Sequence, residues 1–380
     1  MRFTHLTIEN WKNFREVDVP LQRRVFLVGP NASGKSNLLD ALRFLRDIAG
    51  PQGGFQRAVA SRQGVSQIRS LQARPRANVV LDVRMQIGDG TWRYRLEFHQ
   101  DRTHAPVVRK EEVWHGDEKL LTRPDRLDRD DPQRLTQTHL EQVNANKGFR
   151  QVAEFLAQVS DIHIEPQLIR ERERYVGREH APFGGDLLDQ MARMQQEQKR
   201  TFNARMRRII EASRIAVPQL EKLELVADER GVPHLRGLYE QDRPDAGWQN
   251  EDQFSDGTLR LLGLLWALLD GVGPLLVEEP ERSLHSTVIG YIPAMMWRLG
   301  RKTGRQILVS THSADLLSDE SIAAEEVLML EPAKGGTRVS LAATHEQIRA
   351  LLAGGLSIGQ AVIPRTAPPR VEQLSLISDE

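Results

Sequence analysis

Residues 26–37 read FLVGPNASGKSN, and this stretch constrains the fold more than any other part of the 380-residue chain. The apolar run at its start is typical of a buried strand. After Lys35, apolar residues recur at helical spacing, at Leu38, Leu39, Ala41, Leu42 and Leu45. A strand that enters a glycine-containing turn and then a helix indicates an α/β fold.

The eight residues 29–36, GPNASGKS, fill every fixed position of a phosphate-binding loop (P-loop). Glycines allow a tight backbone whose N–H groups point at a phosphate, at the positive end of the following helix. Lys35 is expected to reach the β- and γ-phosphates, and the Ser36 hydroxyl to bind Mg²⁺. A chance glycine-rich turn is the alternative, which the strand-to-helix context disfavours. The residues predicted to hold the nucleotide here are Gly29, Asn31, Ser33, Gly34, Lys35, Ser36 and Asn37.

A second buried strand, at 274–277, ends in the acids Glu278 and Glu279. Glu278 would hold Mg²⁺ through water, and Glu279 would polarise the attacking water as a general base. Paired acids after a strand also cap helix N-termini, so the pair by itself leaves both interpretations open.

Two further segments carry polar residues at positions that suit a phosphate. In QILVSTHS (306–313), a buried strand runs into His312, and a neutral imidazole can donate one hydrogen bond to a γ-phosphate and accept another. In FSDGTLR (254–260), Ser255 is the expected N-cap of an apolar helix, whose first N–H groups form an anion site. Taken by itself, His312 would more often be a structural histidine, and Ser255 would be only a helix N-cap.

Taken in order, these four segments resemble an ABC-type ATPase head of the OLD/RecF/SMC-like group, as found among AAA-family ATPases of bacterial defence modules. The resemblance covers residues 1–50 and roughly 250–350. It implies an α/β fold: a P-loop ABC-type ATPase head with a mixed sheet, an antiparallel β subdomain and an inserted helical lobe. It also implies ATP and Mg²⁺ as cofactors and a dimer that closes around two ATP molecules.

The resemblance assigns roles to individual residues. Glu278 would be the Walker B acid and a metal ligand together with Ser36, and Glu279 the catalytic glutamate. His312 would be the switch histidine, and residues 281–284 the D-loop. The signature, with Ser255 and Gly257, would meet ATP bound on a second subunit.

Three features depart from the family pattern. The signature reads Ser-Asp-Gly-Thr where transporter subunits have Ser-Gly-Gly-Gln, and Ser286 replaces the usual proline after Leu-His. No Q-loop is evident: Gln67 and Gln167 are candidates, and neither is chosen.

The chain changes character along its length. Residues 1–122 read as strands around one helix, with strands at 78–86 and 91–98 joined by a hairpin at 88–90; a charged linker follows at 123–134. Helical periodicity covers about 137–160 and 185–213, short strands are expected at 223–226 and 234–239, and an α/β pattern begins after residue 248. We therefore predict three parts: 1–122, the first half of the head; 123–220, a mainly helical lobe; and 221–380, the second half. The spacing between Lys35 and Ser255 fits a compact lobe and not a coiled-coil arm.

Composition excludes several classes of protein. There are no cysteines, which rules out disulfides, thiolate metal sites and cysteine nucleophiles. Charged residues interrupt the N-terminal segment, unlike in a signal peptide, and the longest apolar run, 261–269, is too short to span a bilayer. We expect a soluble, cytoplasmic protein without a membrane partner.

Lys plus Arg and Asp plus Glu both number 52, so any nucleic-acid surface has to be local. No acid lies between Asp47 and Asp82, and this segment predicts a possible DNA contact through Arg57, Arg62, Arg69, Arg74 and Arg76. A solvated surface or a protein contact is an equal alternative. It is the favoured interpretation for a second cluster, Lys199, Arg200, Arg205, Arg207 and Arg208.

The leading hypothesis is an ATPase, converting ATP and water to ADP and phosphate, that acts as a dimeric switch or sensor in a DNA-related or anti-phage process. It would control a separate effector, a nuclease or toxin. OLD nucleases carry a Toprim domain after the ATPase, and the roughly 30 residues after the last predicted helix are too few for one. The alternatives are a RecF-like repair ATPase that binds DNA directly and, disfavoured by the signature and the long insertion, a transporter ATPase.

Overall fold

The computed structural model describes residues 1–74, 77–171, 184–240 and 247–367. By compactness the chain divides into two units. The first comprises Met1–Ser160, Val272–Leu276 and Pro293–Glu380, and the second comprises Asp161–Gly271 and Val277–Ile292. The three-part division stays a prediction.

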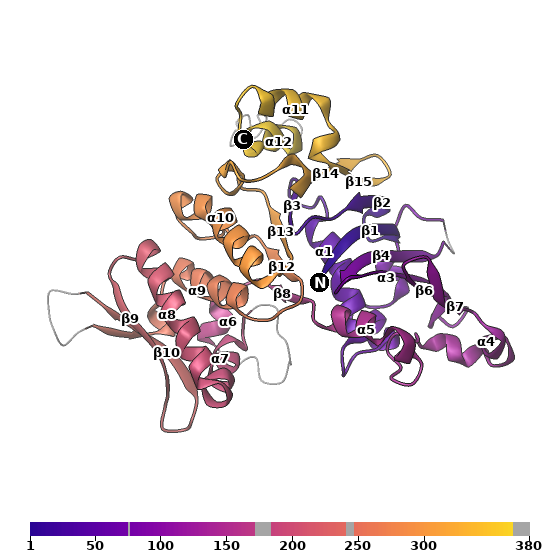
Figure 1. Cartoon of the computed structure of the whole chain (residues 1–380), viewed down its shortest axis with the longest axis horizontal. Helices are drawn as coiled ribbons and strands as arrows, with labels where there is room; N and C mark the ends of the chain where they lie inside the picture. Colours follow the sequence, from indigo (N-terminus) through magenta and orange to yellow (C-terminus); the bar gives the residue numbers. More distant parts are fainter. Residues whose placement is uncertain (75–76, 172–183, 241–246, 368–380) are drawn as a thin grey trace, which may run out of the picture. The chain divides into compact units, whose positions relative to one another are not determined.

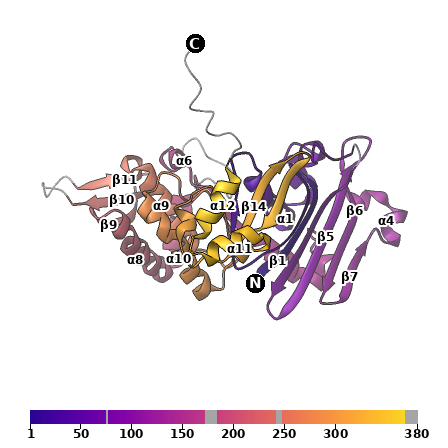
Figure 2. The same ribbon diagram turned by 90° about the horizontal axis from the view of Figure 1, so that it is seen from above.

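The first unit contains a six-stranded antiparallel sheet in the order β2-β1-β4-β5-β6-β7, whose strands Figure 2 shows side by side. Burial alternates along β5, where Trp92, Tyr94, Leu96 and Phe98 face the core, as expected for a sheet with one covered face. The predicted hairpin at 88–90 is confirmed, because Ile87 pairs with Gly90 across a two-residue turn. The strands are β1 Arg2–Trp11, β2 Phe14–Pro20, β4 Val79–Ile87, β5 Gly90–Gln100, β6 Pro106–His115 and β7 Glu118–Arg123.

A second, mixed sheet has the order β15-β14-β3-β13-β12-β8. Strand β3 (Arg24–Val28) is buried at all five positions and pairs in parallel with β13 (Ile307–Thr311) and β14 (Val327–Ala333). β15 (Gly336–Leu341) is antiparallel to β14. At the other edge, β12 (Leu275–Glu278) and β8 (Ser160–Ile162) lie where the chain passes from one unit to the other.

Helix α1 (Lys35–Ala49) follows β3, as the sequence predicts. Its buried face joins residues of both sheets and of α5 (Arg150–Ala157) in one hydrophobic core. The remaining helices of the first unit are α2 Phe55–Ala60, α3 Val65–Ile68, α4 Arg126–Asp130, α11 Glu346–Ala353 and α12 Ile358–Thr366, with short 3₁₀ turns between some of them.

The predicted helix over about 137–160 is wrong except for α5. The Glu111 carboxylate accepts hydrogen bonds from the backbone N–H groups of His139 (2.8 Å) and Leu140 (3.0 Å). The Asn146 amide donates to the carbonyl of Leu140 (2.9 Å). Because side chains take these backbone groups, the segment before α5 forms turns and a short 3₁₀ helix, Asn146–Phe149, instead of an α-helix.

A buried ionic cluster fixes the segment that the sequence marks as a charged linker. The Arg123 guanidinium contacts Glu111 (3.0 Å) and Asp128 (2.8 Å), and all three side chains are fully buried. The Tyr94 hydroxyl donates to Glu111 as well (3.1 Å). Residues 123–134 are therefore anchored to the sheet. The linker prediction is wrong here because Glu111 on β6 and Tyr94 on β5, which lie outside the segment, complete the cluster.

The second unit holds a three-stranded antiparallel sheet, β11-β10-β9, and helices (Figure 1). The predicted strands near 223–226 and 234–239 are confirmed as β9 and β10, but the helix over 185–213 is split at Gln198 into α7 and α8. Helix α8 packs against α9, where Arg205 pairs with Asp270 (2.8 Å) and lies over the Trp266 ring. The elements are α6 Pro166–Arg170, α7 Leu187–Glu197, α8 Lys199–Ala216, β9 Leu220–Ala227, β10 Pro233–Tyr239, β11 Trp248–Asn250, α9 Asp256–Leu269 and the start of α10 Ser286–Thr303.

Replacing Arg123 by Met should lower the free energy of unfolding by roughly 3–5 kcal/mol, because two buried carboxylates would lose their cation. Urea unfolding of the first unit measures this change. The matched control Arg126→Met removes an exposed arginine three residues away and should change that free energy by less than about 0.5 kcal/mol. Equal effects of the two substitutions would contradict the account.

The same cluster predicts a pH dependence. Burial of Asp128 opposes its charge, but hydrogen bonds from Arg123 and the backbone of Asp125 hold the pKa of this carboxyl well below its usual range. The resulting stability is present above the unfolded-state pKa of an aspartate, about 4, and is lost as the pH falls through the lower folded-state pKa.

Candidate functional site

The loop 29–36 has the backbone that a phosphate cradle requires. Between β3 and α1, Ala32 (φ 62°) and Gly34 (φ 96°) adopt left-handed conformations. A Cβ on Gly29 would lie 2.6 Å from the carbonyl oxygen of Leu330, so a larger residue does not fit there. Both fixed glycines of the motif are thus demanded by the observed geometry.

The two residues that close the loop sit at the N-terminus of α1. Lys35 is buried and its Nζ donates to the carbonyls of Gly29 (2.8 Å) and Pro30 (3.1 Å). Ser36 is exposed, and the first turn of α1 carries no acid to offset its positive end. Asn31 is exposed on the loop, whereas the Ser33 hydroxyl is buried without a hydrogen-bond partner among the residues that the structure describes.

The turn between β1 and β2, with the end of β1, makes hydrogen bonds to the P-loop and to the first turn of α1. These contacts were not predicted from the sequence. The Asn13 amide donates to the carbonyl of Ser33 (2.8 Å) and accepts from the side chain of Asn37 (2.8 Å). The Trp11 indole N–H donates to the carbonyl of Asn37 (2.8 Å). The only available signal was a tight turn, WKNF, between two alternating strand patterns.

A pocket of about 440 Å³ lies beside the P-loop, within the first unit. It includes Ser36 at the end of the loop, Asn37 in the first turn of α1 and Lys12 from the β1–β2 turn. Gln67, one of the two Q-loop candidates, also lines it, whereas Gln167 lies in α6 of the second unit.

His312 and the P-loop lie at the same edge of the mixed sheet. In the parallel pair, Thr311 at the end of β13 is opposite Val28 at the end of β3. His312 and Gly29 are therefore the first residues beyond two neighbouring strand ends, and His312 is exposed there. This register brings the two motifs to neighbouring strand ends.

In the second unit, the signature residues have the predicted cap geometry. The backbone of Ser255 is extended, and its hydroxyl accepts from the N–H of Thr258 (3.1 Å), so Ser255 is the N-cap of α9. A Cβ on Gly257 would lie 2.4 Å from the carbonyl oxygen of Ser283, so only glycine lets the segment 281–284 pass this closely. This packing reason for glycine is invisible in the sequence.

Glu278 is the last residue of β12, and Glu279 follows it with a left-handed backbone (φ 44°). Arg282 contacts the Glu279 carboxylate (3.4 Å) and approaches Glu165 (3.6 Å). Both acids are half-buried. Over the described ranges, no three His, Asp or Glu side chains form a metal cluster.

The arginine-containing segment between Asp47 and Asp82 has no acids of its own, but acids from another element pair with one of its arginines. Helix α1 supplies Asp40 (2.7 Å) and Asp47 (2.9 Å) to Arg62, which also lies over the Phe44 ring. The lack of acids in the segment therefore does not leave Arg62 an uncompensated charge, because acids of α1 pair with it. Arg57 and Arg74 are exposed, Arg69 is half-buried, and Arg76 lies outside the described residues.

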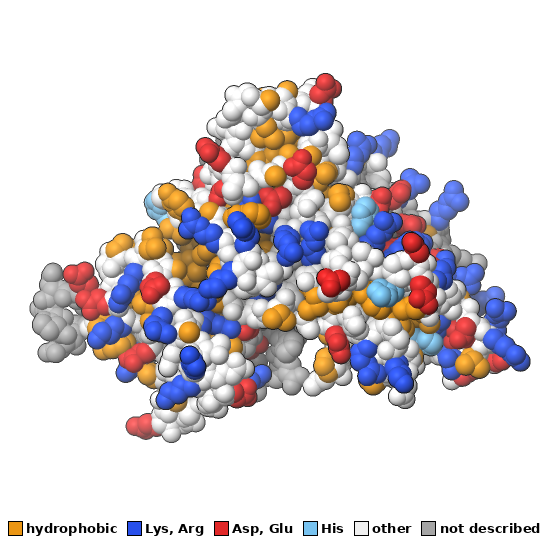
Figure 3. Space-filling view, viewed as in Figure 1, with side chains coloured by type: hydrophobic (Ala, Val, Ile, Leu, Met, Phe, Trp, Pro, Cys, Tyr) orange, Lys and Arg blue, Asp and Glu red, His pale blue; other side chains and the backbone are white. Residues whose placement is uncertain are grey.

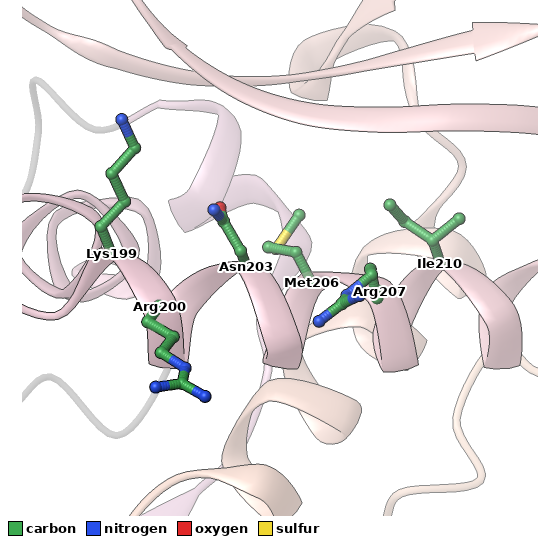
Figure 4. A pocket seen from close by; sticks show the side chains of 6 residues that line it. All are labelled: Lys199, Arg200, Asn203, Met206, Arg207 and Ile210. Carbon is green, nitrogen blue, oxygen red and sulfur yellow. The ribbon is translucent and has the colours of Figure 1, made fainter.

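Only part of the second basic cluster shares one surface. Lys199, Arg200 and Arg207 line an open groove of about 790 Å³ on α8. Figure 4 shows Arg200 pointing away from the side of the helix that Lys199 occupies. Arg205 is paired with Asp270, and on the face in Figure 3 basic side chains are scattered among acidic ones. A solvated surface or a protein contact stays the favoured interpretation of this cluster.

Within the described part of the chain, no helix is both long and apolar enough to cross a membrane.

The sequence is similar to known proteins in two ways. A family profile described as "AAA domain, putative AbiEii toxin, Type IV TA system" matches residues 24–319. Among curated proteins, endonuclease GajA of Bacillus cereus (strain VD045) is 40% identical over 58 residues, 15% of this chain and 10% of GajA. The DNA replication and repair protein RecF is 33% identical over 84 residues in Roseiflexus castenholzii (22% of this chain, 21% of RecF) and over 89 in Chloroflexus aggregans (23% and 22%). The chain thus spans less than a quarter of each relative's length.

Solved SMC head domains share the fold. One, bound to the C-winged helix domain of ScpA, superimposes with a TM-score of 0.56 at 14% identity, covering 90% of this chain and 97% of that one. Another, with an extended coiled coil and bound to the C-terminal domain of ScpA derived from Pyrococcus furiosus, gives 0.54 at 11% identity, covering 93% and 99%. The predicted fold class, an ABC-type ATPase head with a mixed and an antiparallel sheet, is confirmed. With a family match over most of its length, the chain belongs to the AAA-domain family described as putative AbiEii toxin, Type IV TA system.

Proposed function

We propose that this chain binds ATP with Mg²⁺ at the loop 29–36 and hydrolyses it to ADP and phosphate. The observation that carries the proposal is the loop itself. It combines left-handed Gly34, a Gly29 with no room for a side chain, and Lys35 at the start of a helix without acid in its first turn. Backbone N–H groups and the helix dipole then act together on phosphate oxygens.

The ligands available to the metal fit Mg²⁺. The Ser36 hydroxyl and the Glu278 carboxylate are hard oxygen donors, which this ion prefers, and it commonly takes its other ligands from water and phosphates. When bound, Mg²⁺ would neutralise charge on the β- and γ-phosphates. We assign the pocket beside Ser36, lined by Lys12 and Asn37, to the remainder of the nucleotide.

We assign proton transfer to Glu279. As general base its carboxylate takes a proton from the attacking water, and the contact with Arg282 orients that carboxylate. His312, exposed beyond the end of β13, would hydrogen-bond the γ-phosphate. Lys35 would exchange its loop carbonyls for phosphate oxygens as negative charge develops.

We propose that the signature acts on ATP held by a second copy of the chain. Ser255 is exposed at the N-terminus of α9, where backbone N–H groups favour an anion. The one acid in that turn, Asp256, is paired with Arg170 (2.8 Å), so it does not cancel the positive end of the helix. A symmetric dimer would place each signature over the partner's γ-phosphate.

For the biological role, we propose an ATP-driven switch or sensor in a DNA-related or anti-phage defence process in the cytoplasm, controlling a separate nuclease or toxin. The toxin-associated family and the stretch shared with endonuclease GajA support this reading. The alternative, direct DNA binding as in a repair ATPase, is supported by the stretch shared with RecF and by the exposure of Arg57 and Arg74.

Glu279→Gln tests the ATPase. It preserves size and hydrogen bonding but removes the proton acceptor, so turnover should fall about 10²–10⁴-fold while ATP binding persists. Steady-state phosphate release and equilibrium ATP binding measure the two effects. Glu211→Gln, an exposed substitution on α8, serves as the control. Turnover within a few-fold of wild type would remove Glu279 from this role.

Salt-dependent DNA binding tests the alternative. Replacing Arg57 and Arg74 with Ala should reduce the slope of log affinity against log salt by about one unit per lost phosphate contact. Arg62→Ala should instead reduce the free energy of unfolding, because Arg62 is held by two carboxylates. An unchanged slope in the double variant, or a wild-type protein that binds no DNA, would refute direct binding through these arginines.

A further inference from the structure

The β1–β2 turn is a fixed part of the first unit. Strand pairing runs up to Trp11 opposite Phe14, so Lys12 and Asn13 form a two-residue turn, with Lys12 left-handed (φ 51°). The Lys12 N–H donates to the carbonyl of Ile68 (2.6 Å). The turn is therefore held from outside the hairpin as well as by its own strands.

Within this turn, the Asn13 side chain uses its donors and its acceptor on three different elements. Its Nδ2 donates to the P-loop carbonyl of Ser33 (2.8 Å) and to the Thr337 hydroxyl on β15 (2.7 Å). Its Oδ1 accepts from the Asn37 amide in the first turn of α1 (2.8 Å). The Asn13 carbonyl also accepts from the N–H of Thr337 (2.9 Å), which fixes the turn against β15.

Asn13 also packs directly on the loop. A Cβ added to Gly34, at φ 96°, would lie 2.2 Å from Asn13 Nδ2. A Cβ on Gly336 would lie 2.6 Å from the Asn13 carbonyl oxygen. The space between the P-loop and β15 is thus filled by this one amide, with glycine on both sides.

The chemistry of the three contacts selects an amide. Aspartate at position 13 would place a carboxylate oxygen against the Ser33 carbonyl, where the amide now donates a hydrogen bond. Alanine would leave the Ser33 carbonyl and the Asn37 amide without these partners. Asparagine alone, at this length, supplies donors and an acceptor together.

We propose that Asn13 is a positioning residue that holds the P-loop in its phosphate-binding conformation before nucleotide arrives. This inference rests on the proposed binding of ATP at the same loop. A site that is competent only part of the time binds more weakly in proportion to that fraction. If the unsupported loop is competent about 1–10% of the time, loss of Asn13 raises the apparent Kd by about 10- to 100-fold.

The test is nucleotide affinity in Asn13→Ala, measured by calorimetry with a non-hydrolysable ATP analogue and Mg²⁺. We expect Kd, and KM for ATP, to rise about 10- to 100-fold, while kcat at saturating ATP stays within a few-fold of wild type. Asn13→Asp should weaken binding at least as much. Hydrogen exchange of the backbone amides at 31–37 should speed up in the nucleotide-free variant, with the amides of β4 unchanged.

Asn10→Gly is the matched control. Asn10 lies on the same hairpin with φ 57°, which glycine tolerates, and its side chain makes a hydrogen bond to the carbonyl of Asn78 (2.8 Å). This substitution should leave Kd unchanged. If Asn13→Ala does not fold, Thr337→Val, which removes one of the three contacts, should raise Kd by a smaller factor.

The outcomes separate the two proposals. If wild type binds the analogue and Asn13→Ala binds it equally well, the positioning role alone is overturned. Where Asn13→Ala does not fold, the same conclusion follows if Thr337→Val binds the analogue as well as wild type does. An equal loss in Asn10→Gly also overturns it, because the effect would then belong to the hairpin as a whole. Wild type that binds no nucleotide overturns the proposed function and this inference with it.

Discussion

Parallel pairing of β3 with β13 is the constraint on which the candidate site depends. It brings Val28 and Thr311, from the two ends of the chain, into register at one edge of the mixed sheet. Since β3 is buried along its whole length, a shift of this register would break the core, so the register is fixed by packing. The loop 29–36 and His312 then emerge side by side, at the carboxyl edge where α/β sheets bind ligands.

The conformation of the P-loop depends on contacts with other segments as well as on its own sequence. Gly29 and Gly34 permit the backbone of the loop. The Asn13 amide connects the loop, and the Trp11 indole connects the first turn of α1, to a different sheet. Local sequence therefore specifies what conformations the loop can adopt, and tertiary contacts select one of them. This division of labour is expected wherever a binding loop has to be ordered before its ligand arrives.

Patterns confined to a few residues could be predicted from the sequence: the P-loop, the Ser255 cap and the 88–90 hairpin each depend on local chemistry. Contacts between distant segments could not. Asp40 and Asp47 neutralise Arg62 because α1 packs against the segment that follows it. The helix expected before α5 does not form, because the Glu111 carboxylate accepts a hydrogen bond from the backbone N–H of His139. The reason for Gly257, the carbonyl of Ser283, also lies outside any local motif.

The proposed site is composite: Lys35 of one copy and Ser255 of a second copy would act on the same ATP. Mixing Lys35→Ala with Ser255→Arg tests it most directly. Each variant alone should be inactive, whereas an equal mixture should recover about a quarter of wild-type ATPase activity, because half of the dimers are mixed and each of these has one intact site. A mixture that stays inactive, together with wild-type turnover per subunit that does not depend on protein concentration down to the monomer, would contradict the claim.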